Sequence, residues 1–239
     1  MRHLRDYWTP ARIPGVEEIF EARLPLADAA AGTAWPGQRG VATAAQGTNA
    51  PVYRHAAFSG VEAMQFAVDD SLTLDSFAAR FEGNVALTLS FVFTLQNAGA
   101  TESVFSFGNS ADANQFFQVR TTSAGGVQIV SRGQGDGANT TSAAGVNLAN
   151  DAATVLTIAH DGATFDAWVN GRVTGAAVAN DYGTTVFDRG GFAVLRRTID
   201  QQFGNLKMHA AVFALGKTPA SDILRTHRYY MARLGISVA

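Results

Sequence analysis

The sequence lacks cysteine entirely and has no long apolar run, few prolines and little charge. Without cysteine, disulfide scaffolds, cysteine-ligated zinc sites and thiol catalysis are excluded. No apolar stretch approaches the roughly 20 residues of a membrane-spanning helix, so no membrane insertion is expected. The 18 basic and 20 acidic residues leave a formal net charge of −2. This balance excludes an overall basic nucleic-acid binder, and we expect no nucleic-acid partner.

The chain is rich in apolar residues instead. Of its 239 residues, 47% are hydrophobic and 10% are aromatic. A chain of this length buries roughly 70% of the surface that it exposes when unfolded, so it can build a core without disulfides or metals. The first residues carry positive charge but no apolar segment follows them, which predicts no signal peptide.

The clearest periodic segment lies between residues 85 and 95. One face of it carries Val85, Leu87, Leu89, Phe91, Phe93 and Leu95. Strict alternation with β-branched and aromatic residues predicts a long sheet strand with these side chains in the core. Shorter strands are predicted at residues 64–68, 104–107, 115–120, 127–131, 154–160, 164–169, 191–195 and 206–215, and a long loop at 131–150.

Two turn signals and one helix complete the pattern. Asp161-Gly162 and Asn170-Gly171 bracket the strand at 164–169, and such pairs supply the positive φ angles of tight antiparallel hairpins. Residues 219–234 predict a helix, with Thr218 as its cap and Gly235 at its end. Many short strands with one terminal helix predict an all-β antiparallel sandwich or jelly roll.

We expect two segments: an N-terminal arm at residues 1–25 and a single sandwich domain at 26–239. The arm lacks a clean period, and Pro10 and Pro14 favour an extended backbone there. Solvated tails are poor in large apolar residues, so the arm is predicted either to dock on a neighbouring subunit or to pack on its own domain. The side chains assigned to this role are Leu4, Tyr7, Trp8 and Ile13.

Four stretches, taken in order, resemble one known family. They are Trp8–Val16, then Asn49–Tyr53 with Met64–Phe66 and Asp69–Leu72, then the turns Thr157–Gly162 and Trp168–Gly171, and finally Thr226–Ile236. This order resembles the laminin-G-like, concanavalin A-like jelly roll found in structural proteins of tailed bacteriophages and related particles. The tryptophan–leucine–aspartate that the family carries soon after the first stretch is absent here.

The resemblance implies a concanavalin A-like antiparallel β-sandwich with a short C-terminal helix. It also implies a non-enzymatic tail, fibre or head-decoration protein of a virion or phage-like particle, made in the host cytoplasm. Its partners would be other particle proteins and a host-surface glycan, and it would be an oligomer or a repeated subunit. A purely architectural subunit without a ligand and a glycan-degrading enzyme remain as alternatives.

The residues give little support to an enzyme. Glycoside hydrolysis needs two carboxylates across the scissile bond. The nearest match to the Glu-x-Asp-x-Glu pattern of jelly-roll hydrolases is Glu17–Glu21, where Ile19 replaces the central Asp. We predict a solvated charge cluster there. No Gly-x-Ser-x-Gly elbow occurs, and His160 and His227 are expected to be packed or hydrogen-bonded.

Polar loops supply the remaining candidates for a site. The ligand-binding candidates are Asn109, Asp112, Asp136, Asn139, Asp181 and Tyr182. Hard oxygen ligands suit Ca²⁺, for which Asp69 and Asp70 are the candidates. No other cofactor is expected. These Asp and Asn residues also fit ordinary turn chemistry, in which their side chains accept hydrogen bonds from nearby backbone N–H groups.

Overall fold

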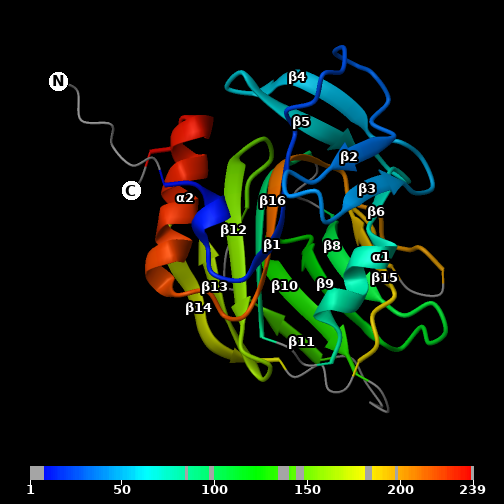
Figure 1. Cartoon of the computed structure of the whole chain (residues 1–239), viewed down its shortest axis with the longest axis vertical. Coiled ribbons are helices and arrows are strands. Elements are labelled where there is room, and N and C mark those ends of the chain that lie inside the picture. Colours follow the sequence, from blue (N-terminus) through cyan, green and yellow to red (C-terminus); the bar gives the residue numbers. More distant parts are fainter. Residues whose placement is uncertain are drawn as a thin grey trace.

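The protein is described here by a computed structural model that covers residues 8–83, 86–96, 100–133, 140–143, 148–180, 185–196 and 199–237. Across these residues two antiparallel sheets of eight strands each pack face to face (Figure 1). No helix in this part of the chain is long and apolar enough to cross a membrane. The architecture is the sandwich that the alternating pattern predicts.

The first sheet is organised around its strand β16. Along one edge β16 pairs with β7, and along the other it pairs first with β5 and then with β1. The strand order is β14-β13-β12-β7-β16-β5-β4, with β1 beside β16. The bounds are β1 Val16–Glu21, β4 Val52–Phe58, β5 Val61–Phe66, β7 Leu87–Leu95, β12 Ala153–His160, β13 Thr164–Val169, β14 Arg172–Ala179 and β16 Leu206–Leu215.

The second sheet has the order β11-β10-β9-β8-β15-β6-β3-β2. Its strands are β2 Ala34–Pro36, β3 Thr43–Gln46, β6 Leu72–Thr73, β8 Ser103–Gly108, β9 Phe116–Thr121, β10 Val127–Arg132, β11 Thr140–Ala143 and β15 Arg189–Phe192. The chain also forms one longer helix, α2 Ala220–Leu234. It forms three short helical turns as well: η1 Pro10–Arg12, α1 Asp75–Ala78 and η2 Ala79–Phe81. Strand β11 lies within the stretch that the sequence predicts as a loop.

Phenylalanine rings fill the space between the sheets. Phe91 of β7 and Phe213 of β16 meet Phe105 from the opposite sheet, with ring centroids 5.5 Å and 5.0 Å away respectively. All three side chains are fully buried. Offset and edge-on arrangements of this kind add to the stability that area burial provides. The predicted inward face of the strand from residue 87 onward is therefore confirmed.

Replacing Phe91 with Ala is expected to lower the free energy of unfolding by about 3–5 kcal/mol, because it leaves a cavity between two rings. Chemical denaturation measures this loss. Val173→Ala on the edge strand β14 is the control, since Val173 is 49% exposed and its loss should stay within about 0.5 kcal/mol. A loss below 1 kcal/mol for Phe91→Ala would contradict the inward assignment.

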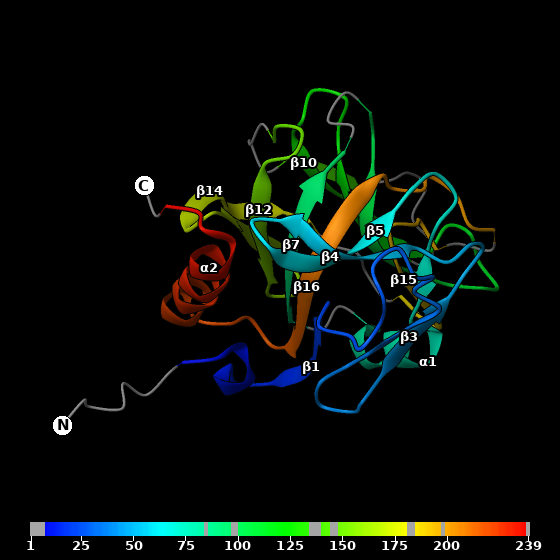
Figure 2. The same cartoon turned by 90° about the horizontal axis from the view of Figure 1, so that it is seen from above.

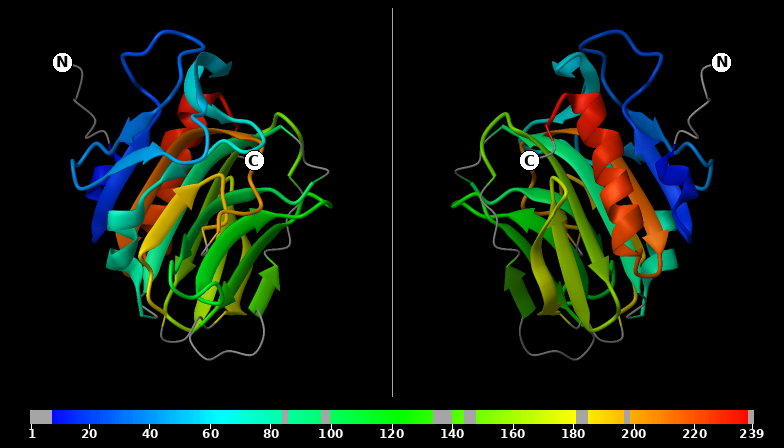
Figure 3. Two further views of the ribbon diagram at one scale, coloured as in Figure 1. Left: turned by 90° about the vertical axis from the view of Figure 1, so that its right-hand side faces the viewer. Right: turned by 90° about the vertical axis from the view of Figure 1, so that its left-hand side faces the viewer.

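Helix α2 lies across the outer face of the first sheet (Figure 3). Its buried residues Tyr230, Met231 and Leu234 form a second apolar cluster with Val92 and Val212 from the sheet. Gly235 ends the helix in the left-handed conformation, with φ of 67°, as expected. The predicted cap needs correction, because the N-cap residue is Pro219 and no side chain caps the helix. The Thr218 hydroxyl, which would have to accept from the helix, has no hydrogen-bond partner among the described residues. The Thr218 N–H donates to Thr88 Oγ1 over 2.8 Å.

Part of the segment expected as an arm, residues 1–25, lies in the first sheet. Val16–Glu21 forms a strand of the first sheet, paired with β16. Ile13 is 4% exposed within the cluster under α2, and the ring of Trp8 lies 6.5 Å from that of Tyr229. Figure 2 shows the segment that leads into β1, drawn in blue, running beside α2. The apolar side chains of residues 8–20 thus pack on their own domain. Leu4 and Tyr7 lie outside the described residues, and a docking role for them stays a prediction.

Candidate functional site

An open groove of about 450 Å³ lies over β4, β5 and β16 of the first sheet. Its lining residues come from three strands and from the loop before β2: Asp28, Arg54, His55, Ala56, Ala57, Gln65 and Lys207. A volume of this size falls within the range of about 300–1,000 Å³ that is usual for small-molecule sites. The groove is therefore large enough to hold an organic ligand.

Strand alternation places the polar groups of the groove on the outer face of the sheet. Tyr53, Met64 and Met208 belong to the core between the sheets. Successive side chains of a strand point to opposite faces. The neighbours of these core residues, Arg54, Gln65 and Lys207, therefore point outward. The groove thus stands on a rigid sheet, next to the part of the same face that α2 covers.

Gln65 separates the two cations of the groove and orients one of them. Its Oε1 accepts a hydrogen bond from Arg54 Nε over 2.8 Å, and its Nε2 donates to Gln96 Oε1 over 3.3 Å. Gln65 is also the register partner of Lys207 in the antiparallel pairing of β16 with β5. Among the described residues, no carboxylate forms an ion pair with Arg54 or Lys207. The two positive charges of the groove therefore have no ion-pair partner within the described residues.

His55 and Asp28 form the other wall. The His55 N–H donates to Asp28 Oδ1 over 3.0 Å, and the ring Nε2 lies 2.8 Å from the carbonyl oxygen of Leu26. A carbonyl only accepts, so this Nε2 carries the proton. The imidazole ring also packs edge-on against Tyr53, with centroids 5.2 Å apart. The wall is thus held by backbone contacts and a buried ring.

The chemistry of the groove is ionic and polar. Among the described residues, the groove is lined by Arg54, Lys207, His55 and one carboxylate, that of Asp28, and by no tyrosine, tryptophan or phenylalanine. A single carboxylate cannot supply both the acid and the nucleophile or base that glycoside cleavage needs. The arrangement suits binding of a polar or negatively charged ligand.

The loop candidates that the structure describes are engaged in their own turn. Asn109 Oδ1 accepts from the N–H groups of Ala111 and Asp112 over 2.7 Å and 3.2 Å. Asp112 accepts from the Asn114 N–H, which is the main reason that its pKa is lowered from the usual value. These oxygens stabilise the β8–β9 connection. The other four candidates, Asp136, Asn139, Asp181 and Tyr182, lie outside the described residues.

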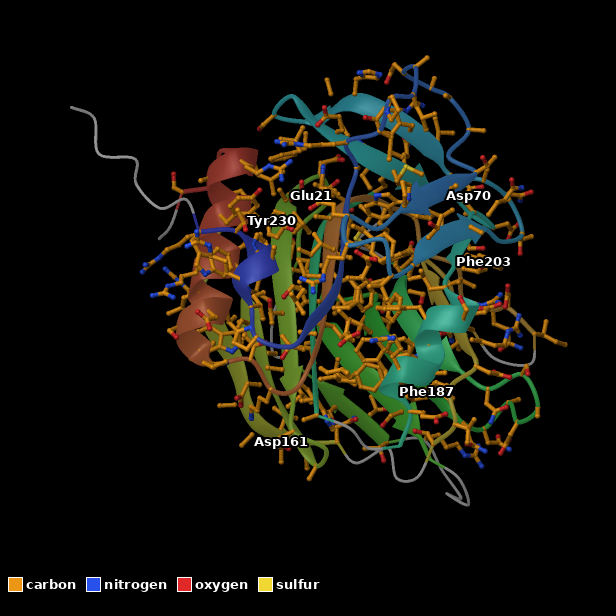
Figure 4. The ribbon with its side chains drawn as sticks, in the orientation of Figure 1. Glu21, Asp70, Asp161, Phe187, Phe203 and Tyr230 are labelled. Atoms are coloured by element: carbon orange, nitrogen blue, oxygen red, sulfur yellow. The ribbon has the colours of Figure 1, made fainter. Side chains whose placement is uncertain are left out.

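The calcium candidates Asp69 and Asp70 also sit in a turn. Asp70, labelled in Figure 4, accepts at Oδ2 from the Ala67 N–H over 2.9 Å. Asp69 adopts a positive φ of 71°. Over the stretches that the structure describes, no three His, Asp or Glu side chains come together as metal ligands would. Nothing in these stretches adds a third ligand to the pair.

The glutamates of Glu17–Glu21 do not form the solvated cluster that the sequence predicts. Glu17 pairs with Arg80, and Glu18 is fully buried with four backbone N–H donors around its carboxylate. Glu21 Oε1 pairs with Arg233 of α2 over 2.7 Å (Figure 4). The segment is a sheet strand whose carboxylates serve packing contacts, and it makes no paired catalytic site.

The packed role expected for His160 and His227 is confirmed. His160 Nδ1 accepts from the Gly162 N–H over 2.9 Å, and its Nε2 donates to the Asn180 carbonyl over 2.6 Å. His227 Nδ1 accepts from the Gly171 N–H over 2.9 Å. Both imidazoles therefore tie a hairpin turn to its surroundings.

Sequence reasoning missed the groove itself. Its two cations are far apart in the chain, and only the pairing of β16 with β5 and of β5 with β4 brings them to one place. One signal was available, because Lys207 alternates with Leu206 and Met208 and so had to face outward. Arg54 gave no such signal, since the stretch around it shows no sustained period.

The sequence matches no protein-family model and no curated protein. Solved structures do match. Domain 4 of AbnA, a GH43 extracellular arabinanase from Geobacillus stearothermophilus solved with arabinotriose, superposes with a TM-score of 0.68 at 11% identity, covering 90% of this chain and 100% of that one. The receptor-binding domain of a botulinum neurotoxin C/D mosaic gives 0.65 at 9% identity, covering 92% and 52%.

A third match is a mutant of the NanB sialidase from Streptococcus pneumoniae, with a TM-score of 0.55 at 14% identity, covering 68% of this chain and 27% of that one. The chain thus spans about half of the neurotoxin domain and about a quarter of the sialidase. At such identities the likeness shows the fold alone. Together with the two antiparallel sheets and helix α2, it confirms the expected all-β antiparallel sandwich with a short C-terminal helix.

Proposed function

We propose that this protein is a non-catalytic carbohydrate-binding module whose site is the groove over β4, β5 and β16. The observation that carries the proposal is the groove itself, an open polar space of about 450 Å³ on a rigid sheet face. Ligand sites are usually such concavities with a few convergent polar groups. The match over the whole length of an arabinanase domain solved with arabinotriose supports the ligand class.

We further propose that the module serves as a structural or attachment subunit of a virion or phage-like particle. The support is the order of sequence stretches from Trp8–Val16 to Thr226–Ile236, which resembles phage jelly-roll proteins. Its partners would be other particle proteins and a glycan of the host surface, with several copies on each particle. The alternative is a purely architectural subunit without a ligand.

A glycan array of the purified protein tests the module against the architectural alternative. We expect binding that Ala57→Leu weakens at least tenfold, because a larger side chain fills the groove. Val173→Leu, on the exposed edge strand β14, is the matched control and should leave binding unchanged. Absence of glycan binding, together with incorporation into particles seen by negative-stain microscopy, would favour the architectural subunit.

We expect no release of reducing ends from polysaccharides that the protein binds. Asp28 is the one carboxylate that lines the groove in the part of the chain that the structure describes, and hydrolysis needs two. A reducing-sugar assay measures this against heat-inactivated protein. Activity above that background which Asp28→Asn abolishes would show that the module is an enzyme.

A further inference from the structure

We infer that the groove over β4, β5 and β16 selects acidic carbohydrates, with a sugar carboxylate or sulfate bound between Arg54 and Lys207. The inference rests on the proposed function and names the class of ligand within it. It is carried by two cations that line the groove and have no ion-pair partner among the described residues.

Arg54 is oriented for an external acceptor. Its Nε donates to Gln65 Oε1 over 2.8 Å, which fixes the plane of the guanidinium. No acceptor in the described residues takes a hydrogen bond from its two terminal nitrogens. A fixed guanidinium presents these donors side by side, in the geometry that matches the two oxygens of a carboxylate or sulfate.

Lys207 supplies the second charge at a suitable spacing. Its register partner is Gln65, and the strand that carries Arg54 is the next one beyond. Neighbouring strands lie roughly 4.8 Å apart, and Arg54 is two residues from Val52, the β4 register partner of Gln65, so the backbones of the two cations are about 12 Å apart across β5. Both side chains are long and half-buried, and both reach over the same face. An anionic group on a ligand in the groove can therefore contact the two cations together.

Asp28 sets the orientation of the ligand. Its carboxylate repels an anion, and its Oδ1 is already held by the His55 N–H. The Asp28 side of the groove is therefore suited to accept hydrogen bonds from sugar hydroxyl groups. The anionic group lies at the Arg54 and Lys207 side, and the neutral ring lies toward Asp28.

The lining also disfavours a neutral sugar. Apolar sugar faces gain affinity by packing on aromatic rings, and none of the described residues that line this groove is a tyrosine, tryptophan or phenylalanine. A neutral ligand would leave both cations without a charged partner. Charge-assisted hydrogen bonds are about twice as strong as neutral ones, so an acidic sugar binds the two cations more tightly than a neutral sugar does.

Isothermal titration calorimetry on the full chain tests the inference with three probes of equal length: trigalacturonate, a sulfated galactotriose and unmodified galactotriose. We expect at least one acidic probe to bind at least tenfold more tightly than the neutral one. Arg54→Gln and Lys207→Gln should each weaken acidic binding about tenfold and leave neutral binding unchanged. Arg228→Gln, an exposed position on α2, is the matched control and should change neither. Circular dichroism verifies that each variant is folded.

The outcomes separate the two proposals. Preference for the uronate alone or the sulfate alone supports the inference and identifies the anionic group. Equal binding of all three probes, lost in Ala57→Leu but kept in Arg54→Gln, overturns the inference while the carbohydrate site stands. Acidic binding that falls equally in Arg228→Gln reflects general charge attraction and also overturns it. Failure of every probe, and of the glycan array, overturns both.

Discussion

Lowering the pH from 7 to 4 is expected to reduce the free energy of unfolding by up to about 6 kcal/mol, about 3 kcal/mol for each of two buried histidines. Burial lowers the pKa of both His209 and His227 from 6.5 to about 4. Each pKa unit corresponds to about 1.4 kcal/mol of difference between the two protonation states. The folded protein therefore resists protonation that the unfolded chain accepts.

His227 is held neutral by its contacts as well as by burial. Its ring is fully buried beneath α2, and Nδ1 accepts from the Gly171 N–H over 2.9 Å. Nε2 lies 2.9 Å from the Thr157 hydroxyl, which in turn lies 2.7 Å from that of Ser90. A second proton would have to go to Nδ1, so protonation breaks the bond to Gly171. This contact joins the β13–β14 turn to the helix.

His209 faces cations as well as an apolar surface. The ring is 4% exposed, and Nδ1 lies 2.9 Å from the carbonyl oxygen of Glu62, so Nδ1 carries the proton. Beyond burial, the charges of Lys207 and Arg233 lower its pKa further, whereas the Glu62 contacts raise it. Nε2 has no hydrogen-bond partner among the residues that the structure describes. Protonation would place a buried positive charge close to the two cations.

The lowered histidine pKa values make the folded protein less stable as the pH falls from 6.5 to 4. The unfolded chain binds more protons than the folded one between pH 6.5 and 4, so stability is complete above 6.5 and falls as the pH approaches 4. Glu102 acts in the opposite direction, because burial raises its pKa from 4.5. Asp112 and Asp161 have lowered pKa values and lose their contribution only below the unfolded value of 3.8, outside this window.

Urea denaturation at pH 7, 6, 5 and 4 measures the slope. His209→Gln and His227→Gln should each cost stability at pH 7, and each should remove about half of the slope between pH 6.5 and 4. The double variant should be nearly flat in that range. A slope that neither substitution reduces would show that other groups cause the acid sensitivity.

The strands that the sequence predicts are those in which large apolar side chains recur at every second residue. Residues 87–95 and 206–215 alternate large and small side chains, and both form central strands of the first sheet. Strand β14 escaped prediction because it is an edge strand whose residues Arg172–Ala179 are mostly exposed, so no apolar period marks it. Strand β1 escaped because its glutamates resemble a surface segment, although the structure gives them buried partners.

The candidate site could be predicted from the sequence even less than the strands could. Turn chemistry at Asn109 and Asp112 is local, so the sequence could offer both the turn and the ligand interpretations. The groove depends on contacts between strands that are distant in the chain, such as Gln65 with Lys207. Burial of Glu18 likewise depends on a loop some twenty residues further along. No period or short motif encodes such contacts.

Replacing Glu18 with Ala is expected to lower the free energy of unfolding by about 6 kcal/mol, which exceeds the loss for any ordinary core truncation. The side chain is fully buried in β1. Its Oε1 accepts from the N–H groups of Ile19 and Arg39 over 2.9 Å and 2.7 Å. Its Oε2 accepts from those of Val41 and Ala42 over 2.7 Å and 2.9 Å.

The carboxylate therefore fixes the loop between β2 and β3 onto β1. Each hydrogen bond to a charged group contributes about 1.5–3 kcal/mol, and removal of the side chain leaves buried donors without an acceptor. The loop also fits closely, since a Cβ atom on Gly37 would come within 2.1 Å of the Glu18 carboxyl carbon. Without the carboxylate, the loop loses its anchor and the second sheet loses the order of its β2–β3 edge.

Thermal and urea denaturation measure the loss, and two variants locate its cause. Glu18→Gln keeps the volume and one acceptor but presents an NH₂ group to two N–H donors, so about half of the loss is expected. Glu17→Ala removes a carboxylate one residue away, whose partner Arg80 has a half-exposed side chain. Such a pair contributes about 1 kcal/mol or less. Equal losses for Glu17→Ala and Glu18→Ala would show that general charge, and not the four hydrogen bonds, stabilises this edge of the sandwich.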